Sequence, residues 1–349
     1  MDPVLTGLIV GIAFGFVLQR GRFCMNSAFR DVVLLKDYTL LKSVGAALLL
    51  LLAGYAIMDS TGMISLNPKP LTWGANLLGS FIFGVGMVIA GGCASGITYR
   101  VGEGMVGAIT AVLGLSVAGY LTAAGFLADF KTNLQTDTKI LTADGGNLTL
   151  ANALGIDHLV LALIIFAVAV VIWFVLARKN GESDVWGATE GTLVEKIFKS
   201  GWGWLTTGLL IGVVGLFAFP LSAAAGRNYP LGITAGWIGI VKKVLDFSNP
   251  DVALGWLSWV IIGIILGSLI AALIAGEFKF RVPKVGVLVQ TFIGGCLMGF
   301  GAVTSGGCNI GHLLSGVPQL SLGSILAGLS IIAGAWLTAY LMFVRPQKG

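Results

Sequence analysis

Apolar residues form long, nearly uninterrupted stretches in this chain, and polar residues are confined to short segments between them. Examples are Val44–Ile57, Leu159–Leu176, Ile261–Ile274 and Leu322–Val344. A helix needs about 20 apolar residues to cross the roughly 30 Å of hydrocarbon in a bilayer. Continuous apolar runs also favour helices over barrel strands, in which apolar and polar residues alternate. The pattern predicts about nine to thirteen helical segments in an all-α, polytopic integral membrane protein.

Four of the apolar segments are short and interrupted by glycine, namely residues 4–18, 76–89, 204–219 and 288–303. Each has about 14 to 16 residues and is followed within a few residues by a break that contains glycine. Discontinuous helices occur in membranes where unwound backbone lines a cavity and does not face lipid. These segments therefore predict a transport site built from short, broken or re-entrant helices.

The two halves of the chain share a pattern of glycines and one cysteine. At a constant offset of 215 positions, the matched pairs are Gly79/Gly294, Gly84/Gly299, Gly86/Gly301, Gly91/Gly306, Gly92/Gly307, Cys93/Cys308 and Gly96/Gly311. A weaker match, at an offset near 205, pairs Gly7, Gly11, Gly21 and Arg22 with Gly208, Gly212, Gly226 and Arg227. We therefore expect a single transmembrane domain over residues 1–349 that contains an internal repeat.

The expected repeats cover about residues 1–175 and 202–345, and a cytoplasmic connection over about 178–201 joins them. Paired broken helices in an internal repeat are typical of transporters whose site lies between the repeats, near the middle of the membrane. By analogy with other transporters we expect the two repeats to be inverted.

Composition and charge support the membrane assignment. Hydrophobic residues make up 56% of the chain and charged residues only 11%, against roughly 25% charged in soluble domains. The net charge is +5, but no basic patch interleaved with aromatic residues suggests nucleic-acid binding. Under the positive-inside rule the basic clusters are cytoplasmic and the polar stretch Asp129–Asp157 lies outside. These clusters are Arg178, Lys179, Lys196 and Lys199; Lys279, Arg281 and Lys284; and Arg345 and Lys348.

The matched motifs Ala90–Gly96 and Ser305–Gly311 carry the chemistry we consider most informative. Paired glycines let the backbone turn sharply and approach a ligand closely. The residues after each cysteine can begin a helix, whose free N–H groups favour an anion and make a thiol more reactive. The candidate site residues are Gly91, Gly92, Cys93, Ala94, Gly306, Gly307, Cys308 and Asn309. The alternative is that each motif only allows close helix packing, with cysteine as a small apolar filler.

A third candidate motif, Arg20–Ser27, places Cys24 and Asn26 after a glycine turn. Arg22 could attract an anion there, or Arg20 and Arg22 could be interfacial anchors. Arg100 presents a similar choice. It could draw an anion into a vestibule, or it could extend to the membrane surface and pair with Glu103.

The other cysteine and histidine residues favour structural roles. Cys296 lies inside an apolar run, so we expect it to pack. His312 follows Cys308 by four residues, on the same helical face, where it could tune that thiol but is better interpreted as packing. The chain has no CxxC pair and no cysteine and histidine spacing typical of zinc sites, so no metal is expected. Without a catalytic triad, Walker loop or HExxH motif, we expect a transporter without a cofactor and not an enzyme.

Three motifs occur in a fixed order on this glycine-rich chain: RGRFCMNSAFRD, GGCASG and GGCNIG. This arrangement resembles the YeeE/YedE family of sulphur-compound transporters, over nearly the whole chain. The resemblance implies a multi-pass protein of the bacterial inner membrane with an hourglass shape and nine spanning helices among thirteen. It also implies that thiosulfate passes Cys24, Cys93 and Cys308, and that a small cytoplasmic TusA-like sulphur carrier is a partner.

The residues and the resemblance together suggest a mechanism. A dianion is costly to desolvate in the membrane, and weak donors placed in stages suit conduction better than one strong cation. The expected donors to an intact thiosulfate ion are the thiols, the amides of Asn26 and Asn309, and the N–H groups of Gly92–Ala94 and Gly307–Asn309. One alternative is a membrane sulphur transferase that forms a cysteine persulfide and releases sulfite. Another is transport of a different sulphur or selenium species.

Overall fold

The computed structural model describes residues 2–180, 185–187, 192–249 and 253–347. Its first half contains α1 (Pro3–Arg20), α2 (Met25–Leu34), α3 (Thr39–Ser60), β1 (Leu71–Thr72), α4 (Trp73–Ile89), α5 (Ala94–Gly102), α6 (Val106–Ala124), α7 (Ala128–Asp137), β2 (Lys139–Ile140), α8 (Leu150–Leu154) and α9 (His158–Asn180). Its second half contains α10 (Leu193–Phe198), α11 (Trp204–Ala224), α12 (Thr234–Leu245), α13 (Trp256–Ile274), α14 (Val285–Ser305), η1 (Ile310–Leu314), η2 (Val317–Gln319), α15 (Leu322–Ala339), η3 (Tyr340–Val344) and η4 (Arg345–Gln347).

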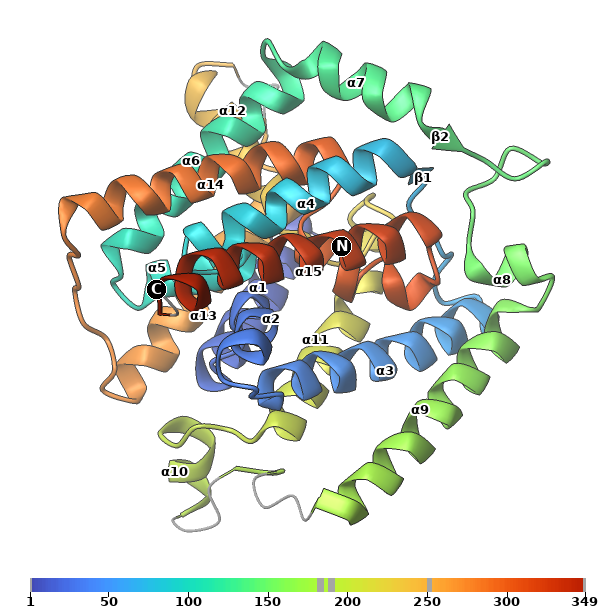
Figure 1. The fold of residues 1–349 in the computed structure, drawn as a ribbon, viewed down its shortest axis with the longest axis horizontal. Coiled ribbons are helices and arrows are strands. Elements are labelled where there is room, and N and C mark those ends of the chain that lie inside the picture. The colour runs from blue at the N-terminus through green and yellow to red at the C-terminus, as the bar shows by residue number, and fades with distance from the viewer. Residues whose placement is uncertain (1, 181–184, 188–191, 250–252, 348–349) are drawn as a thin grey trace.

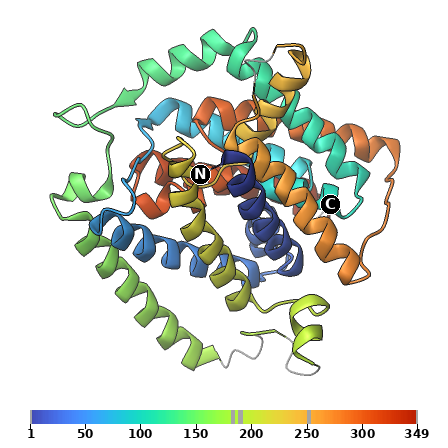
Figure 2. The same ribbon diagram turned by 180° about the vertical axis from the view of Figure 1, so that it is seen from behind.

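Within the described residues, nine helical segments are long and apolar enough to cross a membrane. Three of them join a long helix to a short one across a break: Pro3–Leu34, Trp73–Gly102 and Val285–Leu314. The long helices lie against one another in a single bundle (Figures 1 and 2). The prediction of an all-α, polytopic membrane protein with about nine spanning helices is therefore confirmed.

The broken helices are longer than the sequence predicted. Helices α1, α4, α11 and α14 have 18, 17, 21 and 21 residues, because each helix continues through residues that flank the apolar core of its segment. Each then ends at a break that contains one residue of positive φ: Arg22 (47°), Gly91 (70°), Gly226 (82°) and Gly306 (82°). The left-handed conformation ends a helix, and glycine adopts it without strain. A short helix follows each break, namely α2, α5, α12 and η1.

Glycines allow the central helices to pack closely. A Cβ atom added at Gly79 would lie 2.7 Å from the carbonyl oxygen of Gly301, and one at Gly86 would lie 2.7 Å from that of Gly294. Since the residue numbers rise along α4 while they fall along α14, these two helices are antiparallel. By the same reasoning α1 lies parallel to α13, and α11 lies parallel to α3.

The structure also contains a short two-stranded sheet. Strand β1 pairs with β2 in an antiparallel ribbon, with Leu71 opposite Ile140 and Thr72 opposite Lys139. This ribbon and the neighbouring helices α7 and α8 lie together at one end of the bundle (Figure 1). The expected connection over about 178–201 contains the short helix α10, and parts of that connection, residues 181–184 and 188–191, lie outside the described residues.

Candidate functional site

Cys24, Cys93 and Cys308 are buried, and each stands directly before a short helical segment. Their carbonyl oxygens accept hydrogen bonds of 2.8 to 2.9 Å from the backbone N–H groups four residues later, those of Ala28, Ile97 and His312. The N–H groups in the first turn of a helix have no partner within the helix. The sequence therefore places all three thiols where backbone donors are available.

The breaks after α1 and α4 meet inside the bundle and bring two thiols together. The Sγ atoms of Cys24 and Cys93 lie 3.7 Å apart, and both cysteines are free. The Sγ atom of Cys93 also accepts a hydrogen bond from the Gly96 N–H group at 3.3 Å and lies 3.4 Å from the Ser95 hydroxyl. Two S–H groups are therefore within reach of one small ligand.

Cys308 lies away from this pair, on the wall of a cavity of about 340 Å³. Two cationic side chains, Lys69 and Arg227, also line this cavity. The ammonium of Lys69 donates to the Gly306 carbonyl, and the Tyr229 hydroxyl donates to the Gly311 carbonyl at 2.7 Å. We refer to this space as the Lys69 cavity.

Burial changes the acid–base behaviour of both cations in the Lys69 cavity. Loss of hydration disfavours a charged ammonium. Burial, opposed by the nearby Cys308 and assisted by the positive charge of Arg227, lowers the pKa of Lys69 to about 8. Burial also lowers the pKa of Arg227, to about 10. Lys69 is therefore close to losing its charge in the physiological range.

A second cavity, of about 300 Å³, adjoins the Gly91 turn. Arg100 and Arg281 line it, and the guanidinium of Arg100 donates to the Gly91 carbonyl at 2.7 Å. We refer to this space as the Arg100 cavity. It is bordered by Val287 near the start of α14, whereas the Lys69 cavity is bordered by Val303 near the end of the same helix. The separation of sixteen positions between these two residues corresponds to roughly 24 Å along a helix, so the cavities lie at opposite ends of the bundle.

Amide side chains connect the two cysteine motifs in the interior. The Asn309 side-chain N–H donates to the Met25 sulphur at 3.1 Å, and these residues directly follow Cys308 and Cys24. Within the described part of the chain, the Asn309 side-chain oxygen and both polar atoms of the Asn26 amide are buried without a hydrogen-bond partner. Leaving such groups unpaired costs about 1–3 kcal/mol each, so a polar solute that passes here would gain hydrogen bonds that the protein alone does not satisfy.

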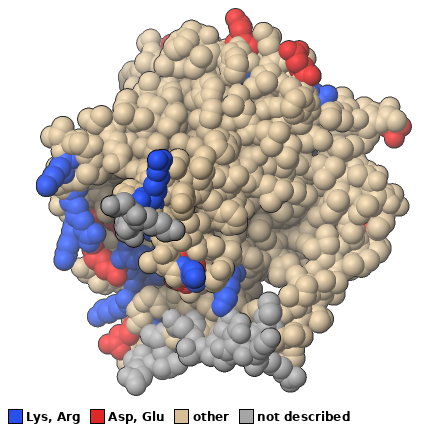
Figure 3. Space-filling view, viewed as in Figure 1, with Lys and Arg blue, Asp and Glu red and all other residues tan. Residues whose placement is uncertain are grey.

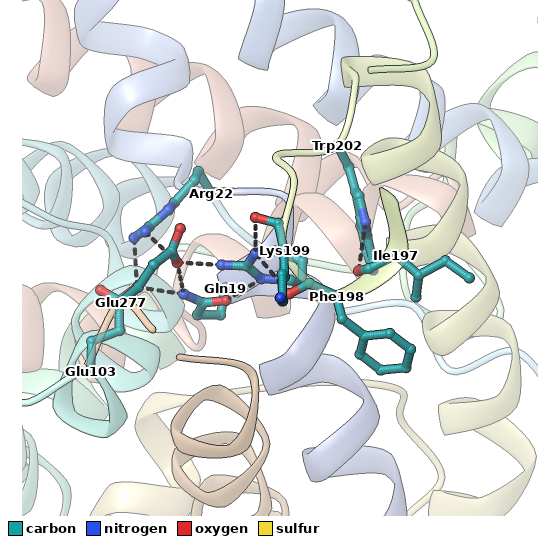
Figure 4. Close-up of polar contacts among 9 residues, drawn as sticks. Gln19, Arg22, Glu103, Ile197, Phe198, Lys199, Trp202 and Glu277 are labelled. Atoms are coloured by element: carbon teal, nitrogen blue, oxygen red, sulfur yellow. Dashed lines mark hydrogen bonds and ion pairs between the residues drawn. The ribbon is translucent and has the colours of Figure 1, made fainter. Parts of the chain in front are cut away.

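The alternative in which Arg100 pairs with Glu103 is wrong, because Glu103 has other partners and Arg100 donates to the Gly91 carbonyl. Figure 4 shows a cluster in which Arg22 donates to Glu103 at 2.6 Å and to Glu277 at 2.7 Å. The Gln19 amide also donates to both carboxylates. Two carboxylates thus offset the charge of Arg22, so its position favours the anchor interpretation over anion attraction.

Arg20 belongs to the same cluster and is fully enclosed. It pairs with Glu277 and donates to the backbone carbonyls of Phe198 and Lys199 at 3.1 and 3.0 Å. The cluster therefore joins the end of α1, the loop after α13 and the end of α10 (Figure 4). Of its members, Arg20 and Arg22 were recognised in the sequence as possible anchors, Arg22 also as a possible attractor of an anion, whereas Gln19 and Glu277 were not singled out.

The remaining sulphur and imidazole groups lie outside this arrangement. Cys296 lies in the middle of α14, where the backbone of Gly114 on α6 packs closely against it. His312 has both ring nitrogens occupied, at 3.2 Å from the Ser324 hydroxyl and from the Ser305 carbonyl oxygen. These contacts match the packing interpretation of both residues.

The sequence interpretation missed Lys69 and Tyr229, and it used Arg227 only as part of the repeat. Both missed residues lie in loops far from the glycine and cysteine motifs. A signal for Tyr229 was present, however, because the offset of 205 that pairs Arg22 with Arg227 also pairs Cys24 with Tyr229. No comparable signal marks Lys69.

A multi-pass helical bundle with broken helices, buried thiols and two cation-bearing cavities defines a membrane transporter. The family model described as "Sulphur transport" matches residues 20–337. The thiosulfate transporter TsuA of Spirochaeta thermophila is 42% identical over 98% of this chain and 100% of its own length. TsuA of Escherichia coli is 30% identical over 99% of this chain and 96% of its own length. The probable transporter YedE of Escherichia coli is 32% identical over 37% of this chain and 32% of its own length.

The chain belongs to the sulphur transport family, and this membership confirms the resemblance to YeeE/YedE proteins. Since these relatives are named as transporters, the prediction of a transporter and not an enzyme is also confirmed.

Proposed function

We propose that this transporter carries thiosulfate into the cytoplasm, across the inner membrane of a bacterium. The observation that supports this proposal most directly is the set of buried thiols between two cation-bearing cavities. Relatives named as thiosulfate transporters match the chain over almost its full length. The same arrangement agrees with the hourglass shape that the family resemblance implies.

The proposed path begins in the Lys69 cavity, where the two cations collect a divalent anion. The ion then meets Cys308, passes the unpaired amides of Asn309 and Asn26, and reaches the adjacent thiols of Cys24 and Cys93. Each step offers weak S–H and N–H donors in place of water, so no single position holds the dianion too tightly to release it. The intact ion leaves through the Arg100 cavity.

The charge distribution supports the proposed direction. Most Lys and Arg atoms in Figure 3 lie toward the left and lower left, the side on which the connection between α13 and α14 lies. Asp and Glu atoms lie on both sides, some among these basic atoms and others at the upper and right edges, where few basic atoms lie. Lys279, Arg281 and Lys284 belong to that connection, so the positive-inside rule favours a cytoplasmic Arg100 cavity. A small TusA-like sulphur carrier would then receive sulphur at this end.

We further infer that the chain is an inverted repeat over about residues 1–175 and 202–345. Helices α4 and α14, which carry the matched glycine motifs, run antiparallel, and their contacts are exchanged in the way a twofold axis requires. Gly79 faces Gly301, and its counterpart Gly294 faces Gly86. In this relation Tyr229 takes the position of Cys24, which explains why the first repeat contributes two thiols to the proposed path and the second repeat only one.

The 3.7 Å separation of the Cys24 and Cys93 sulphur atoms also favours a second candidate function. In a sulphur transferase, one thiolate would attack the outer sulphur of thiosulfate, form a persulfide and release sulfite. The second thiol is placed to receive that sulphur atom from the persulfide. Mass spectrometry separates the two functions. A gain of one sulphur atom on Cys24 or Cys93 after incubation with thiosulfate would support transfer, whereas unmodified thiols during active uptake support the relay.

The decisive experiment measures uptake of labelled thiosulfate into proteoliposomes that contain the purified protein. We expect Cys24→Ala, Cys93→Ala and Cys308→Ala to lose uptake and Cys296→Ala, the matched control, to retain it. Sulfate in excess should not compete, while competition by another sulphur or selenium oxyanion would identify a different substrate. Normal transport by all four variants would contradict the cysteine path.

A further inference from the structure

The proposed transport path is closed in its middle. Cys308 lies on the wall of the Lys69 cavity, whereas Cys24 and Cys93 are not among the residues that line it. Cys24, Met25 and Cys93 are enclosed by the surrounding chain, each with at most 1% of its surface exposed. An ion that leaves the Lys69 cavity therefore meets packed side chains before it reaches the thiol pair, and at least one of these side chains has to move.

Met25 and Asn309 join the two cysteine motifs across this closed region. The Asn309 side-chain N–H group donates to the Met25 sulphur at 3.1 Å, although 284 positions separate the two residues in sequence. Met25 follows Cys24 and is the first residue of α2, and Asn309 follows Cys308 and stands directly before η1. A solute that moves from Cys308 to Cys24 therefore has to pass this contact.

The contact between Met25 and Asn309 is weak and easily exchanged. A thioether sulphur is a poor hydrogen-bond acceptor, and the unbranched methionine side chain has three rotatable bonds that let it take other conformations. The Asn309 oxygen and both polar atoms of the Asn26 amide are buried without a partner within the described residues. Hydrogen bonds to ionised acceptors are roughly twice as strong as bonds between neutral groups. An anion at this position therefore takes the Asn309 N–H group from Met25.

This contact occurs once, although the motifs around it occur twice. At the offset of 205 positions Met25 corresponds to Pro230, and at the offset of 215 Asn309 corresponds to Ala94. The side chains of proline and alanine carry no donor and no acceptor, so the related position in the other half lacks this hydrogen bond. Packing of the repeats therefore does not require the pair, and its place between the thiols indicates a role in transport.

We propose that Met25 is the gate of the transport path and that the Asn309 amide holds this gate shut. The inference rests on the proposed function, because it concerns the same path. In the empty transporter the Met25 side chain fills the space between Cys308 and the thiol pair and occupies the Asn309 donor. A thiosulfate ion that reaches Cys308 accepts the hydrogen bond of Asn309, and the released Met25 side chain turns aside.

A gate of this kind keeps the empty transporter tight to small ions. Thiosulfate carries two negative charges and several acceptor atoms, so one ion can hold the Cys308 thiol and the Asn309 amide together. Chloride has one charge and no second acceptor atom, and it competes less well for the amide that holds Met25. The gate therefore opens for the divalent solute and stays shut against chloride.

The first test measures chloride release from proteoliposomes in the absence of thiosulfate. We expect the wild type to be tight and Met25→Ala, which removes the gate, to release chloride at least tenfold faster. Met298→Ala is the matched control, because Met298 is an equally enclosed methionine on α14 outside both motifs. A Met25→Ala protein that elutes like wild type in size-exclusion chromatography and is equally tight would overturn the proposal, and so would an equal leak through Met298→Ala.

A second test uses Met25→Leu, which keeps most of the volume of the gate and removes its sulphur acceptor. This variant should remain tight to chloride, since a side chain of similar size still fills the path. Its KM for thiosulfate uptake should be several-fold lower than that of the wild type, because the ion no longer competes with Met25 for the Asn309 N–H group. An unchanged or raised KM would contradict the part assigned to Asn309.

Failure of the gate and failure of the proposed function give different results. The chloride assay contains no thiosulfate, so a leak that appears only in Met25→Ala supports the gate whichever anion is the natural substrate. Wild-type protein that takes up no thiosulfate would refute the proposed substrate alone. Normal thiosulfate uptake by the wild type, together with a tight Met25→Ala protein, would refute the gate alone.

Discussion

The sulphur atoms of Cys24 and Cys93 lie 3.7 Å apart, although 69 positions separate the two residues in sequence. Two helix breaks produce this contact, one after α1 and one after α4, and each places its cysteine at the start of a short helix. The pair is therefore the point at which the first and second broken helices of the chain meet. A solute that reaches one of these thiols also reaches the other.

Oxidation should close the proposed path at this pair. A mild oxidant such as diamide takes two hydrogens from Cys24 and Cys93 and joins them in a disulfide, which removes both S–H donors. We expect thiosulfate uptake to fall at least tenfold and to return after treatment with dithiothreitol. Mass spectrometry should show the loss of two hydrogens in wild type and in Cys308→Ala but not in Cys24→Ala. Unchanged uptake by fully cross-linked protein would contradict the path.

The Lys69 cavity should make uptake dependent on the external pH. With a pKa of about 8, the Lys69 ammonium is mostly charged at pH 7 and mostly neutral at pH 9, so capture of an anion should weaken as the pH rises through 8. Proteoliposome uptake measured from pH 6.5 to 9 tests this expectation. Lys69→Arg should remain active at pH 9, because a guanidinium keeps its proton, and Lys69→Gln should be slow throughout. A Lys69→Arg profile identical to that of wild type would assign the pH dependence to another group.

The sequence predicted the parts of this structure that local patterns determine. Apolar runs determine which segments enter a membrane, and paired glycines before Cys93 and Cys308 determine where helices break. Lys69 and Glu277 could not be predicted in this way, because their roles depend on loops that approach one another only in the folded chain. Arg22 and Arg100 illustrate the same limit. Glu103 follows Arg100 closely in sequence, but in the folded chain its carboxylate pairs with Arg22, and Arg100 donates to the Gly91 carbonyl.

Helices α4 and α14 should tolerate even one added methyl group poorly where they cross. At Gly86 a Cβ atom would lie 2.7 Å from the Gly294 carbonyl oxygen and 2.8 Å from the Met298 nitrogen. Both are backbone atoms, so the helices must separate. We expect Gly86→Ala to lower the free energy of unfolding by about 1–3 kcal/mol, as measured by unfolding of the protein in detergent. Gly286→Ala on α14, where a Cβ atom meets nothing, should change it little, and equal effects would contradict the packing argument.

The ion-pair cluster at the end of α1 should contribute to stability through Glu277. Its carboxylate is the partner of the enclosed Arg20, whose side chain is 1% exposed, and of the half-exposed Arg22. Glu277→Gln removes the negative charge and leaves the Arg20 guanidinium with neutral acceptors only, at a cost of about 1–2 kcal/mol because Glu277 is itself partly solvated. Thermal unfolding in detergent should therefore begin at a lower temperature in this variant. Asp144→Asn, in an exposed turn, should leave it unchanged. A Glu277→Gln protein as stable as wild type would show that the Gln19 side-chain oxygen and the backbone carbonyls of Phe198 and Lys199 suffice to hold Arg20.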